Sequence, residues 1–381
     1  MASAAAEEEG DVQKSASAPT SNLVNIGSRK SRLAVIQTEL VHKALREAWP
    51  DLEIELHTMR TAGDKDKVTP LHSFNAKSLW TEELEALLLD GRLDLIVHSL
   101  KDIPTQLPPS LRIGAIFPRE DPRDALVMKP SLPYTSLFSL PPGSIVGTSS
   151  VRRTAQISRR YPHLRFENVR GNIDTRLAKL DAADGRYACL VLAAAGLKRL
   201  DLGHRITHFL DSRMKERNEG AGEGGGVAVQ GTGTGVDREI GWLHAVGQGA
   251  LAVEIRQGDH RIENLLKDLA CKKTTLACLS ERSLMRTLEG GCSVPIGVET
   301  EWADDDHSSS FSSSSPPPLL TMRASVTSTD GASFVESCQS VRMTTEVEAD
   351  EFGRTVAKEL IDKGAGPILQ QILLNRDIVD A

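Results

Sequence analysis

The first hundred residues alternate between short apolar runs and stretches with the periodicity of an amphipathic helix. Apolar residues recur at Leu33, Ile36, Leu40 and Leu45, on one face of a helix that Pro50 ends. We expect strands at residues 23–26, 52–56 and 93–97 and a second helix at 79–89. Strands separated by helices of this length need crossover connections, so the sheet is at least partly parallel and the fold class is α/β.

The same alternation returns in the next part of the chain. We expect strands at residues 144–146, 164–167 and 188–192 and helices at 151–160 and 175–180. Two doubly wound units that face each other leave a cleft, bordered by loops at the carboxyl ends of their strands. The predicted architecture is two doubly wound domains resembling a ligand-binding clamshell, plus a small α/β third domain.

The rest of the chain predicts a return to the first unit and then the third domain. A strand expected at 250–255 rejoins the first domain, which is therefore discontinuous. Helices are expected at 261–269, 274–288 and 350–363, and strands at 294–298 and 319–326. We divide the chain into a disordered tail (1–20), a first domain (21–118 and 246–260), a second domain (119–245, with a glycine-rich insertion at 219–235) and a third domain (261–381).

Composition and charge predict an ordinary soluble protein. The 381 residues are 40% hydrophobic and 25% charged, and no run of about 18 apolar residues could cross a membrane. A net charge of −7 gives no reason for general attraction to nucleic acid or anionic membranes. Five scattered cysteines, an odd number, without a secretion signal indicate reduced thiols and a cytoplasmic location.

Cys292 lies in the run GGCSVP, between a predicted helix and a predicted strand. Glycines before the thiol and a proline after it indicate a turn, so the thiol is expected on a loop. Taken alone, these residues slightly favour a buried, unreactive cysteine, which is the commoner fate of a free thiol. Motifs elsewhere in the chain favour chemistry at this sulfur.

Polar residues follow directly on a buried strand in the run VHSLKDIPT, residues 97–105. Sheets of α/β proteins place functional groups at the carboxyl ends of their strands. A lysine beside an aspartate is costly there unless it is used, so Lys101 and Asp102 are candidate functional residues. The alternative is that these polar groups cap a neighbouring helix. His98 continues the alternation of the strand and fits a hydrogen-bonded core histidine.

Arginines recur in the loops after successive predicted strands. The run GTSSVRR, residues 147–153, combines small hydroxyl residues, a helix start and two guanidinium groups, a combination that favours anions. Arg29, Arg170, Arg176 and Arg199 lie in comparable positions. Guanidinium groups bind carboxylates through two parallel hydrogen bonds. Solvated surface arginines are the alternative, but their recurrence indicates a ligand with several carboxylates or phosphates.

Other common site motifs are missing from the sequence. The run GAGEGG at residues 220–225 matches a dinucleotide-binding pattern in form only, because no strand precedes it and no helix follows it. The sequence has no phosphate-binding P-loop, no HExxH and no cysteine or histidine spacing for zinc. A metal site is not indicated, and a nucleotide-dependent transferase is a weak alternative.

These motifs together resemble those of the hydroxymethylbilane synthase family, also called porphobilinogen deaminases, over roughly residues 23–298. In that family, the cysteine of a Gly-Gly-Cys-Ser loop carries a dipyrromethane cofactor through a thioether, and Cys292 is the matching residue. The aspartate of the HSLKD motif is the family's catalytic carboxylate and matches Asp102. The resemblance implies condensation of four porphobilinogen molecules onto this primer with loss of ammonia, followed by hydrolytic release of a linear tetrapyrrole.

The resemblance also implies which residues hold the acetate and propionate groups of the pyrroles. They are Arg29, Ser31, Ser99, Lys101, Thr148, Ser150, Arg152, Arg153, Arg170, Arg176 and Arg199. It further implies a lid at residues 60–76 and places Trp80 near the rings, where stacking and core packing are equally favoured. The glycine-rich insertion departs from the family and contains none of the motif residues.

A monomer that binds porphobilinogen and dipyrromethane, without metal, is the expectation that follows. The principal alternative is a non-catalytic clamshell that binds a small polycarboxylate, since facing doubly wound units with arginine-lined loops also serve that purpose. That alternative accounts for the arginines but leaves Asp102 and Cys292 unexplained.

Overall fold

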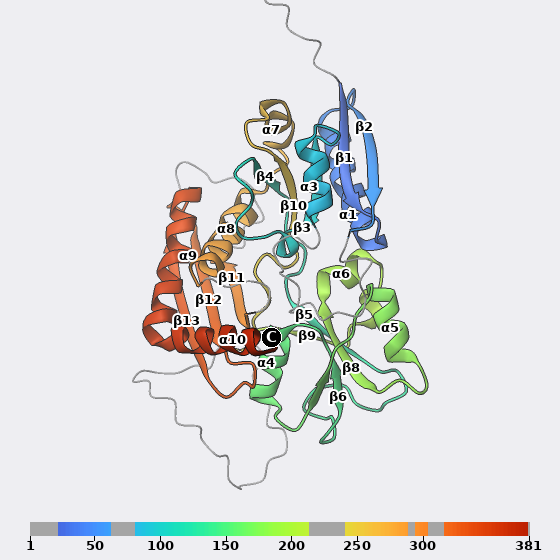
Figure 1. Cartoon of the computed structure of the whole chain (residues 1–381), viewed down its shortest axis with the longest axis vertical. Coiled ribbons are helices and arrows are strands. Elements are labelled where there is room, and N and C mark those ends of the chain that lie inside the picture. Colours follow the sequence, from blue (N-terminus) through green and yellow to red (C-terminus); the bar gives the residue numbers. More distant parts are fainter. Residues whose placement is uncertain (1–21, 62–80, 213–240, 289–293, 304–315, 380–381) are drawn as a thin grey trace, which may run out of the picture.

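Three β-sheets, each accompanied by helices of its own, make up the molecule (Figure 1). The computed structural model describes residues 22–61, 81–212, 241–288, 294–303 and 316–379. Among the described helices, none combines the length and the apolar character that a bilayer crossing requires. The mixed α/β class predicted from the sequence is confirmed.

The first sheet has the strand order β2-β1-β3-β10-β4. Its strands are β1 (Leu23–Arg29), β2 (Glu53–Met59), β3 (Leu95–Ser99), β4 (Leu111–Ile116) and β10 (Leu251–Arg256). β1 is parallel to β2 and β3, whereas β10 runs antiparallel to both β3 and β4. Apolar side chains pack α1 (Arg32–Ala48) and α7 (His260–Leu266) on one face and α3 (Glu82–Leu89) on the other.

The second sheet repeats this arrangement, with the strand order β7-β6-β8-β5-β9. Its strands are β5 (Asp124–Met128), β6 (Ile145–Gly147), β7 (Arg165–Glu167), β8 (Tyr187–Ala193) and β9 (His208–Leu210). β6 is parallel to β7 and β8, and β5 is antiparallel to β8 and β9. Helix α4 (Val151–Arg160) packs on one face, and α5 (Ile173–Asp181) and α6 (Ala194–Arg199) pack on the other, where η3 (Gly203–Arg205) follows.

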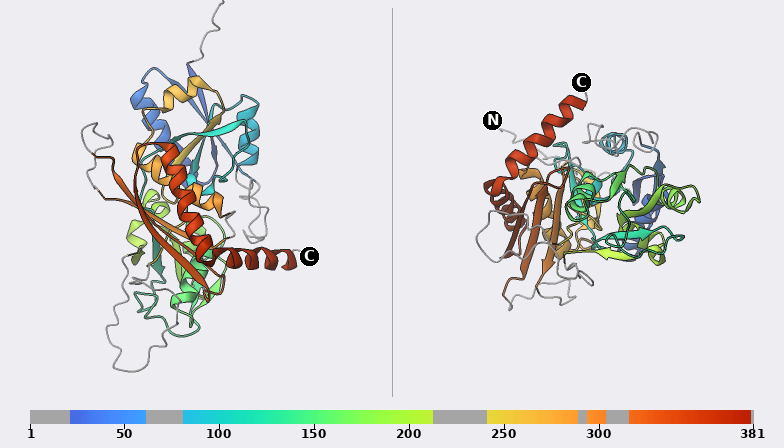
Figure 2. Two further views of the ribbon diagram at one scale, coloured as in Figure 1. Left: turned by 90° about the vertical axis from the view of Figure 1, so that its left-hand side faces the viewer. Right: turned by 90° about the horizontal axis from the view of Figure 1, so that it is seen from below.

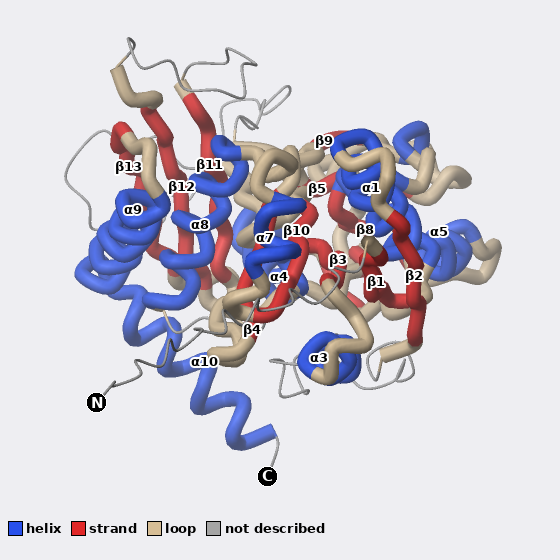
Figure 3. The backbone as a smooth tube through the Cα atoms, turned by 90° about the horizontal axis from the view of Figure 1, so that it is seen from above, coloured by secondary structure: helices blue, strands red, loops and turns tan. Residues whose placement is uncertain are grey.

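The third sheet is antiparallel and has the order β11-β12-β13. The unit contains β11 (Ile296–Trp302), β12 (Leu319–Thr327), β13 (Phe334–Arg342), α8 (Lys272–Thr287), α9 (Glu346–Leu360), the π-helical turn η4 (Ile361–Ala365) and α10 (Gly366–Val379). Both α8 and α9 lie on one side of this sheet (Figure 3). They approach so closely that a Cβ at Gly353 would clash with the carbonyl of Ser280. Helix α10 points away from the body of the molecule (Figure 2).

The chain passes between the first two sheets twice, and the two crossings lie side by side. One crossing leads from β4 to β5, and the other returns to β10. Arg119 Nε donates to the carbonyl of Gln248 at 2.8 Å, and Gln248 Nε2 donates to the carbonyl of Pro122 at 2.7 Å. The third unit is joined at the same place, because Glu281 of α8 accepts two hydrogen bonds from Arg119, at 2.6 and 3.1 Å, and one from the Gly247 amide.

The structure extends the predicted elements in several places. The strand expected at 250–255 is β10, in the first sheet. Strands β4, β5, β9 and β13 were not expected, and the last helix, expected at 350–363, runs as α9 from residue 346 and continues beyond a π turn into α10. The tail, most of the expected lid, Trp80, the glycine-rich insertion and Cys292 lie outside the described residues.

Candidate active site

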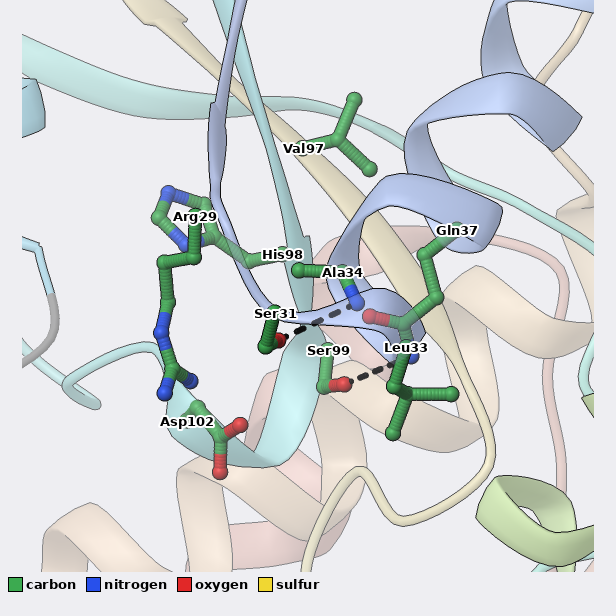
Figure 4. A pocket seen from close by; sticks show the side chains of 9 residues that line it. All are labelled: Arg29, Ser31, Leu33, Ala34, Gln37, Val97, His98, Ser99 and Asp102. Carbon is green, nitrogen blue, oxygen red and sulfur yellow. Dashed lines mark hydrogen bonds between the residues drawn. The ribbon is translucent and has the colours of Figure 1, made fainter. Parts of the chain in front are cut away.

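A pocket lies at the carboxyl ends of β1 and β3, beside the first turn of α1 (Figure 4). Its lining contains four of the predicted site residues: Arg29, Ser31, Ser99 and Asp102. Gln37, His98, Val97, Leu33 and Ala34 complete the lining. The pocket therefore has polar side chains from both strand ends and from the start of α1, with Leu33, Ala34 and Val97 as its apolar part.

Strand pairing explains why these residues meet. β1 and β3 are parallel neighbours, so their carboxyl ends reach the same edge of the sheet. Asp102 follows β3 in η2 (Leu100–Asp102), a 3-10 helix of one turn. Ser31 is the N-cap of α1 and accepts a hydrogen bond from the Ala34 amide at 3.3 Å. Gln37, one turn further along α1, donates to Ser99 Oγ at 2.9 Å. The two strand ends are thus tied to the start of the helix.

Two arginines of the second unit form a buried network around Asp124, the first residue of β5. Asp124 is fully buried and accepts five hydrogen bonds, from Arg152 Nη1, Arg153 Nε, Arg153 Nη2, Trp242 Nε1 and Gln248 Nε2, at 2.6 to 3.0 Å. Burial raises the pKa of Asp124, but the two guanidinium groups lower it by more. The resulting pKa lies well below its usual range. Two cations and one anion leave this group with a net positive charge.

The sequence predicted Arg152 and Arg153 as ligands for carboxylates, and the structure gives both a carboxylate partner inside the protein. Each guanidinium also donates to a backbone carbonyl, Arg152 to Leu243 at 2.6 Å and Arg153 to Val191 at 2.8 Å. Their expected contact with a ligand stays a prediction. Any such contact involves side chains that Asp124 already orients.

Lys101 lies where the first and second units meet. It is half-buried, and its pKa is lowered by burial, with Arg153 and Arg152 adding to the decrease and Asp102 opposing it. Burial likewise lowers the pKa of Arg176 to about 10, with further lowering from Arg153 and Arg170 and an opposing effect of Asp102. These electrostatic effects indicate that Asp102 lies near cations of the second unit.

The remaining predicted ligands of the second unit lie at strand and helix ends. Thr148 is buried and its Oγ1 accepts from the Ser150 amide at 3.2 Å, while Ser150 caps α4. Arg170 lies close enough to Arg176 to lower its pKa. Arg199, at the end of α6, donates to the carbonyl of Gly249 at 2.7 Å, so the structure places it at the returning crossing.

The third unit contacts the chain at the two residues directly after Asp102. Arg282 of α8 is buried and donates from Nη1 to the carbonyl of Ile103 at 3.1 Å and from Nη2 to that of Pro104 at 2.6 Å. Helix α8 ends at Thr287, five residues before Cys292 in the sequence. Cys292 itself falls outside the described residues, and its role as the attachment site stays a prediction.

Sequence reasoning missed three groups that build this site. Asp124 and Gln37 were not expected, and Glu254 of β10 pairs with His98 inside the first sheet. Their partners are distant in the sequence, so no local motif indicates them. The only local signal for Asp124 is an acidic residue within the run DALVM, at the start of an otherwise apolar strand.

Two family models match the chain, and together they cover all three sheets. The model for "Porphobilinogen deaminase, dipyromethane cofactor binding domain" matches residues 24–264. The model for "Porphobilinogen deaminase, C-terminal domain" matches residues 275–362. The chain belongs to the porphobilinogen deaminase family. The first match includes the pocket, Asp102 and the arginine network, so the site described above lies in the family's cofactor-binding region.

Relatives within the porphobilinogen deaminase family align along almost the whole chain. The porphobilinogen deaminase of Candida albicans is 46% identical over 363 residues, which cover 94% of this chain and 95% of that protein. That of Yarrowia lipolytica is 47% identical over 357 residues, 92% of this chain and 94% of the relative. That of Saccharomyces cerevisiae is 44% identical over 360 residues, 93% and 98% of the two chains.

Proposed function

We propose that this chain is a hydroxymethylbilane synthase that condenses four porphobilinogen molecules, with loss of ammonia, and releases a linear tetrapyrrole by hydrolysis. The observation that carries the proposal is the convergence of Asp102 with cations from two units beside one pocket. The family match supports the same activity. It also argues against the non-catalytic clamshell, which gives no role to Asp102.

The residues present fit a dipyrromethane cofactor. Each pyrrole of this pathway bears two carboxylates, and the site offers guanidinium, ammonium and hydroxyl donors around a net positive network. We assign the cofactor's carboxylates to this set: Arg29, Ser31, Ser99, Lys101, Thr148, Ser150, Arg152, Arg153, Arg170, Arg176 and Arg199. When bound, the dipyrromethane supplies the α-carbon to which substrate units are added. The arginine surplus neutralises the negative charge that grows with each unit.

Asp102 is the proposed catalytic carboxylate. Porphobilinogen loses ammonia to give a methylene-pyrrole cation, and a fixed carboxylate beside the pyrrole N–H groups stabilises that positive charge. The 3-10 turn and the Arg282 contacts behind it hold the backbone that carries this carboxylate, as a preorganised electrostatic group requires.

Cys292 is the proposed attachment point of the cofactor, through a thioether. Its position in the sequence supports this, because α8 leads toward it after contacting the chain next to Asp102 through Arg282. We propose that the chain divides into a first domain (21–118 and 246–260), a second (119–245) and a third (261–381). The third domain would present the sulfur at the cleft.

We further propose a cytoplasmic monomer that acts on free porphobilinogen. The basis is compositional: an acidic chain with scattered thiols and no run of residues suited to a membrane. Size-exclusion chromatography with light scattering tests the monomer, for which a mass near the 41.3 kDa of one chain is expected.

Intact-protein mass spectrometry tests the proposed function. We expect the purified chain to carry the extra mass of two linked pyrroles and Cys292→Ser to lack it. Asp102→Ala is expected to keep the fold, by circular dichroism, and to lose tetrapyrrole formation. A chain without added mass, or near-normal turnover in Asp102→Ala, would contradict the proposal.

A further inference from the structure

His98 and Glu254 form a hydrogen-bonded pair inside the first sheet. His98 Nε2 lies 2.9 Å from Glu254 Oε2, and the two side chains are 3% and 0% exposed. The register places Glu254 opposite Ile96 and His98 opposite Ala252, so both polar side chains project from the same face of the sheet. Ile96 on that face packs against α3, which therefore covers the pair.

Ionisable side chains from neighbouring elements lie near the pair. Glu85 of α3 is nearly buried, and its pKa is raised by burial and by Glu254 and lowered by Thr81 and His98. Arg29 of β1 lines the same pocket as His98, and Asp102 follows on the next turn of chain. The α1 side chains that line the pocket, Gln37 among them, are uncharged. The second oxygen of Glu254, Oε1, is buried without a hydrogen-bond partner.

Stability does not explain such an arrangement. A buried carboxylate with a hydrogen-bond partner contributes little net free energy compared with apolar side chains of the same size, because its charge loses its hydration. An unpartnered carboxylate oxygen adds a further cost. His98 nevertheless lines the pocket that contains Asp102, so this ionisable group borders the candidate active site.

The hydrogen bond to Glu254 determines which nitrogen of His98 can act on a ligand. A carboxylate accepts a proton donor, so neutral His98 carries its hydrogen on Nε2, and Nδ1 keeps a lone pair. No hydrogen bond from another described residue occupies Nδ1. His98 lines the pocket and lies beside Arg29 (Figure 4).

We propose that His98 is a second proton-transfer group of the active site and that Glu254 is the positioning residue that fixes its tautomer. The proposal rests on the proposed function. Each addition joins two pyrrole rings, and the attacking α-carbon must then lose its proton. The electron pair of that C–H bond returns to the ring, and the proton moves to His98 Nδ1, giving an imidazolium paired with Glu254. The ammonia released from the same porphobilinogen takes this proton and leaves as ammonium, so His98 is neutral again.

Nitrogen-15 NMR of the histidine-labelled protein tests the tautomer without reference to turnover. We expect neutral His98 to show a protonated Nε2 and an unprotonated Nδ1 at about pH 8, and Glu254→Gln to disturb this preference. His98→Gln assigns the signal. A protonated Nδ1, or an imidazolium that persists between about pH 6 and 9, would overturn the proposal, since neither can accept a proton there.

Isotope kinetics test the chemical step. His98→Gln is expected to lower kcat about 100-fold with KM little changed, and turnover of this variant is expected to slow further with porphobilinogen that carries deuterium on the α-carbon. His244→Gln is the matched control, a buried histidine at the crossings, and no such isotope effect is expected in it. A His98→Gln enzyme with wild-type kcat, or one with a lowered kcat and no isotope effect, would contradict the proposal. Wild-type protein that makes no tetrapyrrole would instead refute the proposed function.

Discussion

Removal of the Asp124 charge is expected to destabilise the second unit strongly. Asp124 accepts five hydrogen bonds and is 0% exposed, and both arginines bound to it are themselves buried. In Asp124→Asn, two guanidinium groups remain in the interior without their counter-charge. The loss of one partner from a buried ion pair costs about 3–5 kcal/mol, because the charge left behind has neither water nor an opposite charge. We expect a loss of this size in the free energy of unfolding.

The same substitution is expected to change the response to acid. Burial raises the pKa of Asp124, but Arg152 and Arg153 lower it to well below its usual range. A carboxyl group whose folded-state pKa is depressed contributes stability that is complete above its unfolded pKa, about 3.9, and is lost as the pH falls below that value. Wild-type protein should therefore lose stability below about pH 4, and Asp124→Asn should lack this part of the loss.

Trp242 provides a reporter for the measurement, because it is 3% exposed and its Nε1 donates to Asp124 at 2.8 Å. Urea titrations followed by tryptophan fluorescence, at several pH values, give the midpoint and slope of the transition. Asp181→Asn is the matched control in the same unit, since Asp181 is 39% exposed and pairs with Arg205 at the surface. An exposed pair contributes about 1 kcal/mol or less. Equal losses in the two variants would refute the reasoning.

Two further predictions concern the surroundings of Asp102. Arg282→Met removes two hydrogen bonds that this charged side chain donates to the carbonyls after Asp102. We therefore expect the free energy of unfolding, measured by thermal unfolding, to fall by about 3 kcal/mol and kcat to decrease. The control Arg286→Met, within the third unit, should affect kcat much less. Burial lowers the pKa of Lys101, so its positive charge is lost at a lower pH than that of an exposed lysine. KM for porphobilinogen should therefore begin to rise at a lower alkaline pH than the titration of an exposed lysine would give. Lys101→Arg should flatten that rise, and an alkaline profile identical to wild type would contradict the assignment.

The sequence predicted the parts of the site that depend on one strand and the residues directly after it. The apolar run before Asp102 indicates a buried strand, and parallel pairing of β1 with β3 then brings Arg29 to the same pocket. Hydrophobic periodicity specifies such elements locally. The confirmed α/β class and the return of β10 to the first sheet follow from the same signal.

Long-range partners could not be predicted in this way. Asp124 meets Arg153 across 29 positions and Trp242 across 118, and Glu254 meets His98 across 156. A single sequence shows the residues but not which of them face each other in the interior. It also gave no sign that Arg152 and Arg153 are oriented by a carboxylate of the protein. Short strands such as β9, with three residues, carry too few positions for a periodic pattern.

The place of β10 between β3 and β4 has a consequence for biosynthesis. The ribosome delivers β4 long before β10, because the whole second unit is encoded between them. Until β10 emerges, the nascent chain exposes the unpaired edges of β3 and β4, and open edges of this kind pair readily with other chains. The amino-terminal sheet can therefore reach its full strand order only late in translation, after β10 has been synthesised.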